Sequence, residues 1–272
     1  KCSDTMPLRL FYIINCFRYE KPQAGRSREF YQFGTEMFGA PDAAADFTVI
    51  SMADTFIKKL GIKNTALHIN SIGCPECRET YKKRLIEFLN ERKGDLCKDC
   101  LNRLERNPLR VLDCKEEGCK RATVGAPSIL DNLCDECKTH FENLKRYLDA
   151  MGIAYEVDSR IVRGLDYYTK TVFEIITKVP GENGKPDSEL TVCGGGRYDG
   201  LVEQVGGPKC AGIGFGMGTE RLIMVMKQQG VQPGPPRLYD AFIVTMGDDA
   251  RVEGIKLARE LRANGIKCDI DH

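Results

Sequence analysis

Four pairs of cysteines in the middle of the chain constrain its fold more than any other feature. They have the sequences CPEC, CKDC, CKEEGC and CDEC and lie between Cys74 and Cys137. Three pairs have a C-x2-C spacing and the fourth has a C-x4-C spacing. Such spacing is typical of tetrahedral metal sites, to which each pair supplies two thiolates. The sequence therefore predicts a small inserted module that metal stabilises in place of a large hydrophobic core.

The eight thiols suit two four-cysteine sites, and Zn²⁺ is the ion that such sites prefer. The candidate ligands are Cys74, Cys77, Cys97, Cys100, Cys114, Cys119, Cys134 and Cys137. The spacing does not show which pair joins which. Reduced thiols without metal, and disulfides formed on isolation, are the two alternatives. His140, three residues after Cys137, is either a substitute ligand or a histidine on a helix surface.

Length and composition are those of an ordinary globular protein. The 272 residues are 42% hydrophobic and 29% charged, with a net charge of +1. This balance argues against a strongly basic nucleic-acid binder, although a local basic groove is compatible with it. No apolar run approaches the ~18–20 residues that cross a bilayer, and no signal segment opens the chain. We therefore expect a cytoplasmic protein without a membrane segment.

Hydrophobic periodicity divides the remaining chain into helices and strands. The expected strands include 8–19, 29–38, 65–71, 154–158 and 167–177, and the expected helices include 41–60, 78–89 and 138–151. VQPGPPR, at 231–237, has the composition of a linker, and the strand–helix–strand pattern after it resembles the start of an α/β domain. Neither end of the chain looks like a natural terminus, so we expect a fragment of a longer protein.

Polar residues line one face of the strand expected at 29–38. Side chains alternate faces along a strand, so Gln32, Gly34 and Glu36 share one face. The glycine leaves a gap in which a small molecule can lie, and Glu36 can accept a hydrogen bond from a cation or an N–H group. A solvated hairpin with exposed charges explains this stretch equally well.

Arginines supply charge of the opposite sign. Arg18, Arg26 and Arg28 lie in or near the connection that precedes this strand, and guanidinium groups bind phosphate or carboxylate through two donors at once. Arg163 cannot act as an acid or base, but it can stabilise charge that develops on a phosphate. A surface ion pair between Arg163 and a neighbouring aspartate is the alternative.

Paired tyrosines and a glycine-rich segment are two further candidates for a binding surface. If Tyr167 and Tyr168 both lie in the strand that they begin, they point to opposite faces, so that one can line a pocket while the other packs in the core. Every second residue of GIGFGMG is glycine, which clears one face for a flat ring. We expect Thr219 to be the N-cap of the next helix and Arg221 to lie in its first turn, where the helix dipole disfavours a cation unless an anion is also present.

Four segments that follow one another along the chain resemble the motifs of one enzyme family. FRYEKPQAGRSREFYQFGTE resembles motif 2 of the class II aminoacyl-tRNA synthetases, and GIGFGMGTERL resembles their motif 3. RGLDYYTKTVFEI and GGGRYDGL, which lie between them, resemble the two signatures of histidyl-tRNA synthetases. The match covers most of residues 8–226. The closing strand–helix–strand resembles the start of that family's anticodon-binding domain.

The resemblance implies an α+β fold, with a class II synthetase-type antiparallel sheet flanked by helices. It divides the chain into a first segment of the catalytic core with motif 2 (1–73), a Cys-rich insertion domain (74–150), a second segment of the catalytic core with the histidine signatures and motif 3 (151–230), a linker (231–237) and the start of an α/β anticodon-binding domain (238–272).

The resemblance also implies the roles of individual residues. The implied histidine-binding residues are Arg18, Gln32, Glu36, Arg163, Tyr167 and Tyr168. The implied ATP-binding residues are Arg18, Glu20, Arg26, Phe30, Gly212, Gly214, Gly216, Gly218 and Arg221. Arg18 and Arg163 are implied to be catalytic, because they hold the α-phosphate and stabilise its charge as the carboxylate of histidine attacks.

The implied reaction joins L-histidine and ATP, with Mg²⁺, into histidyl-adenylate and transfers histidine to the 3′ end of tRNA(His). Motif 1, through which the family dimerises, and the loop that holds the α-amino group of the substrate are absent, and the anticodon-binding domain is cut short. We therefore expect an active homodimer of the full-length protein, and weak binding of histidine or ATP by this chain alone.

Two other functions remain open. A non-catalytic paralogue, the regulatory subunit of ATP phosphoribosyltransferase in histidine biosynthesis, resembles these synthetases. Such paralogues tend to lose residues that are present here, namely Arg18, Arg26, Gln32, Glu36, Arg163 and Arg221. A zinc-dependent nucleic-acid-binding module unrelated to synthetases explains the cysteines alone. The family does not predict zinc, since many members lack most of these cysteines; the spacing does.

Overall fold

A computed structural model of the chain describes residues 5–19, 22, 26–161, 167–179, 188–232 and 238–271. The chain divides into two compact units, Lys1–Val231 and Gln232–His272, and each is described by itself.

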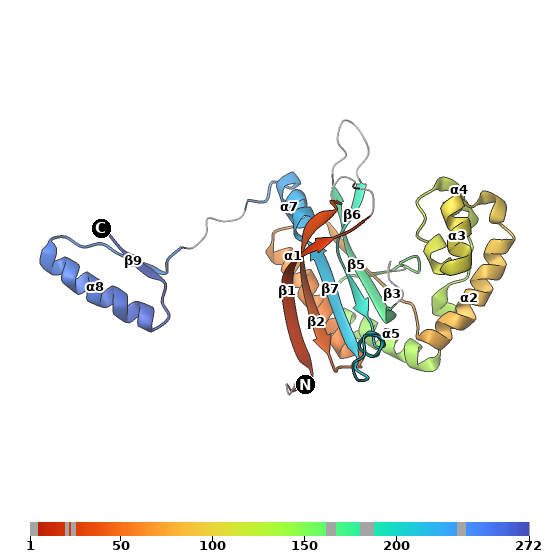
Figure 1. Cartoon of the computed structure of the whole chain (residues 1–272), viewed down its shortest axis with the longest axis horizontal. Helices are drawn as coiled ribbons and strands as arrows, with labels where there is room; N and C mark the ends of the chain where they lie inside the picture. Colours follow the sequence, from red (N-terminus) through yellow and green to blue (C-terminus); the bar gives the residue numbers. More distant parts are fainter. Residues whose placement is uncertain are drawn as a thin grey trace. The chain divides into compact units, whose positions relative to one another are not determined.

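A seven-stranded sheet organises the first unit (Figure 1). Its strands, in spatial order, are β1 (Leu8–Phe17), β2 (Glu29–Phe38), β7 (Gly212–Gly218), β6 (Ser188–Arg197), β5 (Thr169–Val179), β3 (Thr65–Ser71) and β4 (Glu156–Val157). Neighbouring strands are antiparallel except for the parallel pair of β3 and β4. The sheet and its helices confirm the predicted α+β fold.

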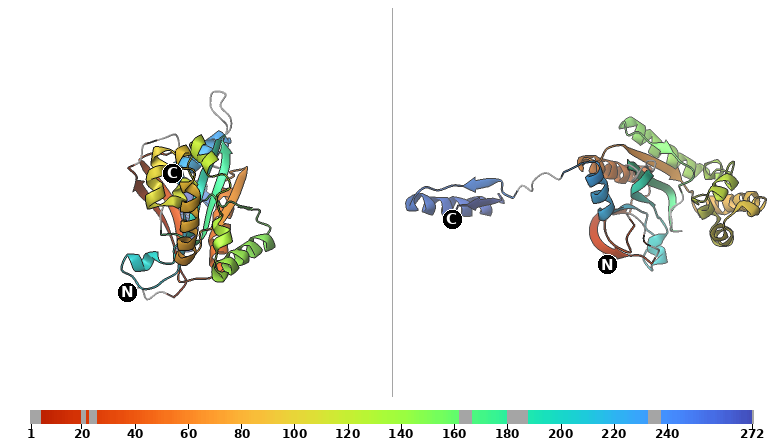
Figure 2. Two further views of the ribbon diagram at one scale, coloured as in Figure 1. Left: turned by 90° about the vertical axis from the view of Figure 1, so that its right-hand side faces the viewer. Right: turned by 90° about the horizontal axis from the view of Figure 1, so that it is seen from above.

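Three helices pack on one face of this sheet. They are α1 (Ala43–Lys59), α5 (Asp135–Ala150) and α7 (Thr219–Gln228), and their apolar side chains join those of the central strands in the largest hydrophobic cluster. Figure 2 shows α1 and α5 on the same side of the sheet. On β2, Phe33 and Met37 belong to this cluster, so the alternate residues of the strand face away from it. The opposite face is therefore left for polar side chains.

Helix α1 begins two residues later than the helix expected at 41–60. Asp42 is the N-cap, and its Oδ1 accepts a hydrogen bond of 3.0 Å from the backbone N–H of Ala44. The carboxylate satisfies one of the N–H groups that a helix leaves open at its start, so the helix begins after the proline. Gly61 follows the helix in a left-handed conformation, with φ of 80°.

Residues 75–132 form a helical module with its own hydrophobic cluster (Figure 1). Its elements are α2 (Pro75–Asn90), η1 (Lys93–Asp95), α3 (Lys98–Arg106), η2 (Pro108–Val111), α4 (Glu117–Ala122) and η3 (Ile129–Asn132). Tyr81, Leu85, Leu89 and Val111 are almost fully buried in this cluster. The module thus has a separate core, built from short elements.

Helix α5 belongs to both parts. Its first residues follow the module directly, whereas Phe141, Leu144 and Leu148 are buried in the cluster beneath the sheet. The predicted insertion includes this helix, and that domain boundary stays a prediction. The packing anchors the last helix of the insertion to the sheet.

The second unit contains β8 (Ala241–Ile243), α8 (Asp248–Ala263) and β9 (Cys268–Ile270), and its two strands pair in parallel. A short helix of the first unit, α6 (Leu201–Gln204), completes the described elements. None of the helices among the described residues combines the length and the apolar character needed to cross a bilayer.

Candidate active site

Glycines clear the centre of the free face of the sheet. In the register of the strands, Gly34 of β2 pairs with Gly216 of β7, and Gly216 pairs with Gly194 of β6. Two residues earlier on β7, Gly214 pairs with Glu36 of β2 on one side and with Gly196 of β6 on the other. A continuous group of glycines therefore extends across three neighbouring strands, and it includes some of the glycines predicted to receive a flat ring.

Polar side chains of β1 and β2 lie over these glycines. Tyr12 of β1 lies where a Cβ on Gly34 would be, Gln32 lies over Gly216 and Glu36 lies over Gly214. Gln32 Nε2 donates a hydrogen bond of 2.8 Å to Tyr12 Oη. The glycines are thus needed because these side chains occupy the space of their missing Cβ atoms.

Glu36 receives hydrogen bonds from two phenols. Tyr198 Oη donates to one carboxylate oxygen, and Tyr12 Oη donates to the other at 3.4 Å. Burial raises the pKa of Glu36, although these hydrogen bonds oppose the shift. Burial and the Glu36 charge raise the pKa of Tyr12 to about 12 and also raise the pKa of Tyr198. Both phenols therefore stay protonated donors, and Glu36 is held in a fixed position.

Three tyrosines and a phenylalanine form an aromatic wall beside Glu36. The rings of Tyr167 and Tyr168 lie 4.6 Å apart, Tyr167 lies 6.0 Å from Tyr198, and Phe38 lies 6.1 Å from Tyr198. Tyr167 and Tyr168 precede β5, so the condition under which they would point to opposite faces, that both lie in the strand, is not met. Their rings instead lie against each other, because the turn before β5 does not impose the alternation of a strand.

The predicted phosphate-binding arginines come together near one end of β2. The Arg18 guanidinium lies 3.7 Å from the centre of the Phe30 ring. Arg221 Nη1 donates a hydrogen bond of 2.7 Å to Thr191 O. Burial lowers the pKa of Arg221, and the charges of Arg18 and Arg26 lower it further. The repulsion that Arg221 experiences from Arg18 and Arg26 favours the binding of a polyanion near these groups.

The N-cap of α7 is Gly218, so the prediction of Thr219 as the cap is wrong. Thr219 begins the helix, and its Oγ1 donates to Tyr31 O at 3.2 Å, which ties α7 to β2. Arg221 does lie in the first turn, as predicted.

Arg163 and Glu20 lie outside the described residues. Their predicted roles at the phosphate and at the adenine therefore stay predictions.

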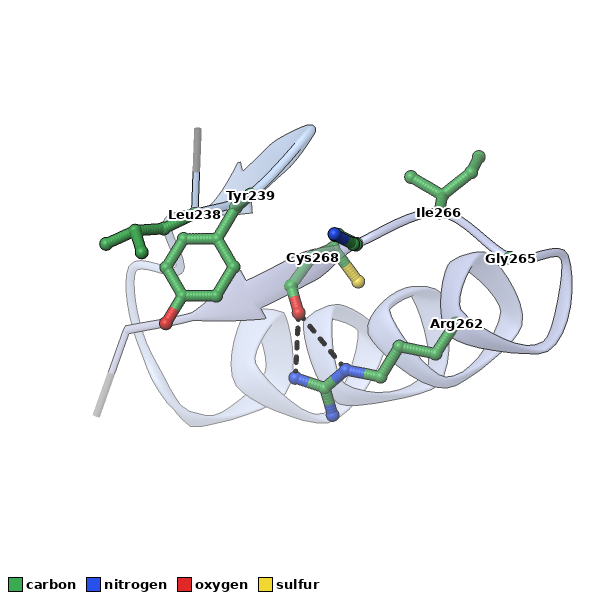
Figure 3. A pocket seen from close by; sticks show the side chains of 7 residues that line it. Leu238, Tyr239, Arg262, Gly265, Ile266 and Cys268 are labelled. Atoms are coloured by element: carbon green, nitrogen blue, oxygen red, sulfur yellow. Dashed lines mark hydrogen bonds between the residues drawn. The ribbon is translucent and has the colours of Figure 1, made fainter. Parts of the chain in front are cut away.

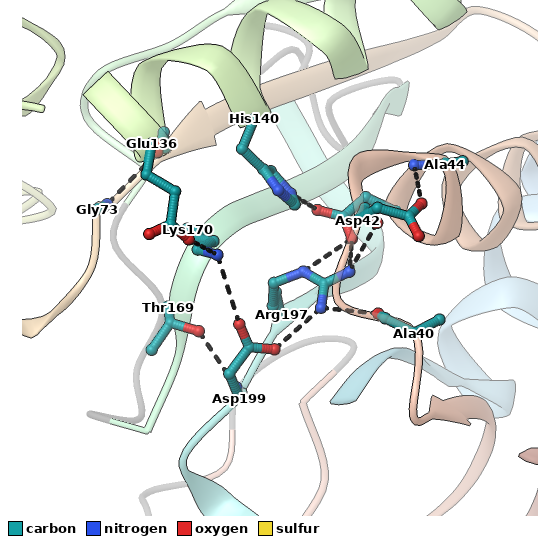
Figure 4. Close-up of polar contacts among 12 residues, drawn as sticks. Ala40, Asp42, Ala44, Gly73, Glu136, His140, Thr169, Lys170, Arg197 and Asp199 are labelled. Carbon is teal, nitrogen blue, oxygen red and sulfur yellow. Dashed lines mark hydrogen bonds and ion pairs between the residues drawn. The ribbon is translucent and has the colours of Figure 1, made fainter. Parts of the chain in front are cut away.

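A buried ionic network beneath the sheet was missed by the sequence analysis. Arg197 is fully buried and donates to Asp46, which is also fully buried. It also donates to Asp199 at 2.9 Å, to Ala40 O and to the backbone oxygen of Asp42 (Figure 4). The GGGRYDGL segment contains Arg197, Tyr198 and Asp199. Its sequence alone does not show that Arg197 is buried in the core while Tyr198 contacts Glu36.

His140 is the second buried partner of Asp46. Its Nε2 lies 2.7 Å from Asp46 Oδ2, and its side chain is 7% exposed. His140 is therefore neither a metal ligand nor a histidine on a helix surface, the two alternatives that the sequence left open. Lys170 lies beside this network, 2.7 Å from Glu136 and 4.0 Å from Asp199.

The structure groups the eight candidate cysteines into two sets of four. One set is Cys74, Cys77, Cys134 and Cys137, and the other is Cys97, Cys100, Cys114 and Cys119. Within each set all Sγ atoms lie within 4.8 Å of one another. A tetrahedron with Zn–S bonds of about 2.3 Å has S–S edges of about 3.8 Å. The Sγ atoms of Cys74 and Cys77 lie 3.5 Å apart, and those of Cys97 and Cys114 lie 3.9 Å apart. Both sets therefore fit a metal ion.

Backbone N–H groups point at the sulfurs. Cys134 N donates to Cys77 Sγ and Cys97 N donates to Cys119 Sγ, both at 3.1 Å. Cys74, Cys97 and Cys134 each occupy the N-cap of a helix without a side-chain capping bond. Helix N-termini and N–H donors stabilise thiolates, the form that binds a metal.

A shallow pocket lies in the second unit, between β9 and α8 (Figure 3). Arg262 extends across it and donates to Cys268 O at 3.1 and 3.2 Å. The residues that line it include none of the predicted binding residues, and its one arginine is engaged with the backbone. We assign no function to this pocket.

Comparisons with known proteins support the resemblance. The family model described as histidyl-tRNA synthetase matches residues 2–222. A histidine–tRNA ligase of Caldanaerobacter subterraneus subsp. tengcongensis is 57% identical over 270 residues, which are 99% of this chain and 63% of the relative. The chain thus spans under two thirds of the length of the curated relatives that it matches.

Solved structures agree with this result. The apo histidyl-tRNA synthetase of S. aureus is 38% identical and superposes with a TM-score of 0.69, over 100% of this chain and 64% of that protein. A Bacillus halodurans protein described as an ATP phosphoribosyltransferase regulatory subunit/histidyl-tRNA synthetase is 22% identical, with a TM-score of 0.54 over 98% of this chain and 68% of that one, and so shares the fold alone. The family model and the similar relatives show that this chain belongs to the histidyl-tRNA synthetase family.

Proposed function

We propose that the protein carrying this chain is a histidine–tRNA ligase. In the first step a carboxylate oxygen of histidine attacks the α-phosphorus of ATP, and pyrophosphate leaves. In the second step a ribose hydroxyl at the 3′ end of tRNA(His) attacks the carbonyl carbon of the adenylate, and AMP leaves. The observation that carries the proposal is that a half-buried carboxylate, Glu36, lies on the same face of β2 as Phe30, whose ring contacts the Arg18 guanidinium. Arg18 and Arg26 in turn both act electrostatically on Arg221.

Histidine binds, in this proposal, beside Glu36 and the aromatic wall. Glu36 accepts a hydrogen bond from an N–H of the substrate, while Tyr198 and Tyr12 fix the orientation of the carboxylate. Gln32 offers an amide to a further polar atom of the substrate, and Tyr167 and Tyr168 supply ring surface. A flat cation or N–H donor fits such surroundings, because aromatic faces attract cations and the carboxylate is already desolvated.

ATP binds across the glycines and the arginines. Arg18 holds the α-phosphate and the substrate carboxylate, Arg26 and Arg221 hold the distal phosphates, and Phe30 stacks on adenine. In the described structure the guanidinium of Arg18 lies on the Phe30 ring, so the two groups already lie together. We assign Glu20 to the adenine and Arg163 to the charge that develops at the α-phosphorus, on the strength of the resemblance. Both Arg18 and Arg163 are thus proposed catalytic residues.

Mg²⁺ accompanies the ATP in this proposal and neutralises charge on the phosphates. Glu174 of β5 is a candidate oxygen ligand, because its charge acts on Arg221 and its Oε2 accepts from Thr191 Oγ1 at 3.0 Å. The two four-cysteine groups bind structural Zn²⁺, which suits their thiolate ligands and their geometry.

The full-length protein acts, in this proposal, as a cytoplasmic homodimer that takes tRNA(His) as its macromolecular substrate. The edge strand β1 exposes large apolar side chains: Phe11, Ile13 and Phe17 are 75%, 64% and 74% exposed. Such exposure supports the proposal that another part of the full-length protein, or a second subunit, covers this strand. Residues 238–272 begin the anticodon-binding domain, and residues 74–150 form the insertion domain. The regulatory paralogue remains the less supported function, because its likeness to this chain is one of fold alone.

Exchange of pyrophosphate into ATP tests the first step. The full-length protein is expected to catalyse this exchange with histidine and with no other standard amino acid, and to charge tRNA(His) but not other tRNAs. The same assay on this chain alone measures what the flanking segments contribute. A full-length protein that binds histidine but gives neither exchange nor charging would support the regulatory paralogue.

A further inference from the structure

The two cysteine groups are nested along the chain. The inner group, Cys97, Cys100, Cys114 and Cys119, lies inside the helical module, where Cys100 and Cys119 belong to the module's own hydrophobic cluster. The outer group, Cys74, Cys77, Cys134 and Cys137, joins the residues that enter the module to those that leave it. The outer group therefore closes the base of the module at the sheet.

The entering strand is tied to the start of β5. Ile72 N donates to Lys170 O at 2.7 Å, and Lys170 N donates to Gly73 O at 2.9 Å, next to Cys74. Gly73 has φ of 66°, and a Cβ on it would overlap Cys77 Cβ. The backbone beside the outer group thus fixes Lys170, which has a left-handed φ of 50° at an irregular point of β5.

The leaving helix is tied to the buried ionic network. His140 lies one turn after Cys137 on the same side of α5, and it contacts Asp46 at 2.7 Å. Glu136, next to Cys137, contacts Lys170 at 2.7 Å. Cys134 occupies the N-cap of α5 without a side-chain capping bond, so its sulfur is left to serve the outer group.

The same network holds the side chain that orients Glu36. Arg197 binds Asp46 and also Asp199 (Figure 4). The backbone N–H of Tyr198, between Arg197 and Asp199, donates to Gly212 O at 2.8 Å. Tyr198 in turn donates to Glu36. A continuous series of contacts therefore leads from the outer cysteines through His140, Asp46 and Arg197 to the carboxylate of the proposed histidine site.

We propose that the outer four-cysteine group binds Zn²⁺ and that this ion positions the 197–199 segment, and through it Glu36, for binding histidine. The inner group binds a second Zn²⁺ that stabilises the module alone. His140 is a positioning residue in this arrangement, because it acts through Asp46 and Arg197. The effect on histidine binding rests on the proposed function; the metal sites and the effect on the 197–199 segment do not.

Metal content tests the sites themselves. The full-length protein, purified without chelator, is expected to contain two zinc ions per chain by plasma mass spectrometry. Cys74→Ser/Cys134→Ser in the outer group and Cys97→Ser/Cys114→Ser in the inner group are matched variants, since each removes the two more accessible ligands of its group. Each is expected to retain one zinc. Wild-type protein with fewer than two zinc ions would overturn the proposal.

Amide hydrogen exchange tests the positioning effect without any assay of activity. The outer-group variant is expected to exchange faster than wild type in peptides that cover 197–199, where Tyr198 N and Asp199 N are hydrogen-bonded. The inner-group variant is expected to match wild type there and to exchange faster only within 93–122. Equal exchange at 197–199 in both variants would contradict the positioning role.

Kinetics tests the consequence for the substrate. In pyrophosphate exchange the outer-group variant is expected to raise the KM for histidine at least about fivefold, the lower end of typical coupling between sites, and to leave the KM for ATP unchanged. The inner-group variant leaves both constants unchanged. A wild-type protein without histidine-dependent exchange would refute the proposed function, while metal content and hydrogen exchange would still decide the inference.

His140→Ala covers the case in which the outer-group variant does not fold. It keeps all eight cysteines, so two zinc ions are expected to remain, while exchange at 197–199 quickens and the KM for histidine rises. His140→Gln, which retains a hydrogen-bond donor for Asp46, is expected to restore some of both properties. Unchanged exchange and KM in His140→Ala would overturn the positioning role.

Discussion

Single residues set the shape of the proposed site, and Gly214 shows this most clearly. A Cβ at this position would overlap the carboxylate of Glu36 and would lie against the backbone oxygen of Thr35. The first contact would displace the carboxylate of Glu36, which we propose binds histidine. The second would strain the backbone of β2, which is held by hydrogen bonds to both neighbouring strands. The glycine is therefore required for packing as well as for the cleared surface.

Gly214→Ala is expected to lower the free energy of unfolding by about 1–3 kcal/mol, the usual cost of overpacking, and to weaken histidine binding. Gly94→Ala is the matched control, because a Cβ there meets nothing within 4 Å. Chemical denaturation measures the first effect and calorimetry with histidine measures the second. Equal stabilities of the two variants would show that the close approach to Glu36 is not present in solution.

The raised pKa of Glu36 predicts a pH dependence of binding. Because burial favours the protonated form, the ionised acceptor is lost at a higher pH than for an ordinary glutamate. Histidine affinity is therefore expected to fall as the pH drops through this raised pKa. The contribution of Glu36 to the free energy of unfolding depends on pH in the opposite direction to histidine binding. It is largest below the ordinary pKa of glutamate and declines as the pH rises through the raised pKa.

Calorimetric titration of histidine at several pH values checks this dependence. Glu36→Gln is the control, since it removes the titrating carboxyl and leaves the titration of the substrate's own imidazole. The dependence in the variant should follow the imidazole alone. Identical pH profiles for the variant and the wild type would rule out Glu36 as the titrating group.

At the scale of elements, the link between α1 and β6 is a buried charge pair. Hydrogen bonding to His140 and the charge of Arg197 hold the pKa of Asp46 below its usual value, although burial alone would raise it. Removing one partner of such a pair leaves the other charge buried without compensation. Asp46→Asn is therefore expected to cost about 3–5 kcal/mol of unfolding free energy at neutral pH.

The same pair predicts acid sensitivity. Its stabilisation is present above the ordinary pKa of aspartate and is lost as the pH falls through the lowered pKa of the folded state. Urea titrations at a series of acidic pH values measure this loss, which Asp46→Asn should abolish. Glu117→Gln is the control at an exposed ion pair and is expected to cost less than about 1 kcal/mol. A similar small cost for Asp46→Asn would contradict the burial of the pair.

The elements show what could be predicted from sequence. The bounds of β2 and β3 match the prediction, because strict alternation and flanking turn residues define such strands. Helices α2 and α5 begin three residues earlier than predicted, at Pro75 and Asp135, since cysteines occupy their N-caps in place of the usual capping residues.

Contacts between distant segments could not be predicted in this way. Tyr12 lies in a strand that is mostly apolar and aromatic, and its position over Gly34 depends on the pairing of β1 with β2. His140 and Asp46 are separated by 94 residues, and each looks like a surface residue of an amphipathic helix. The grouping of the cysteines likewise depends on the fold, because every pair has similar spacing.

At the scale of the whole molecule, the second unit has little core of its own. Phe242, Val244 and Met246 are 56%, 72% and 89% exposed within its described residues. Units of about 40 residues rarely bury enough apolar surface for independent stability. We therefore expect amide hydrogens of 238–271 in this chain to exchange faster than those of β5 and β7, as measured by mass spectrometry. Equal protection would contradict this expectation.

The central claim is that one sheet face holds two adjoining subsites, one for histidine and one for ATP. Glu36 belongs to the first and Arg221 to the second, so paired variants separate the two. The most direct measurement is the KM for histidine and for ATP, in pyrophosphate exchange by the full-length protein, for Glu36→Gln and Arg221→Ala. The account predicts a crossed result, in which Glu36→Gln raises mainly the KM for histidine and Arg221→Ala raises mainly the KM for ATP. Variants that leave both constants at the wild-type values, or that both change the same one, would contradict it.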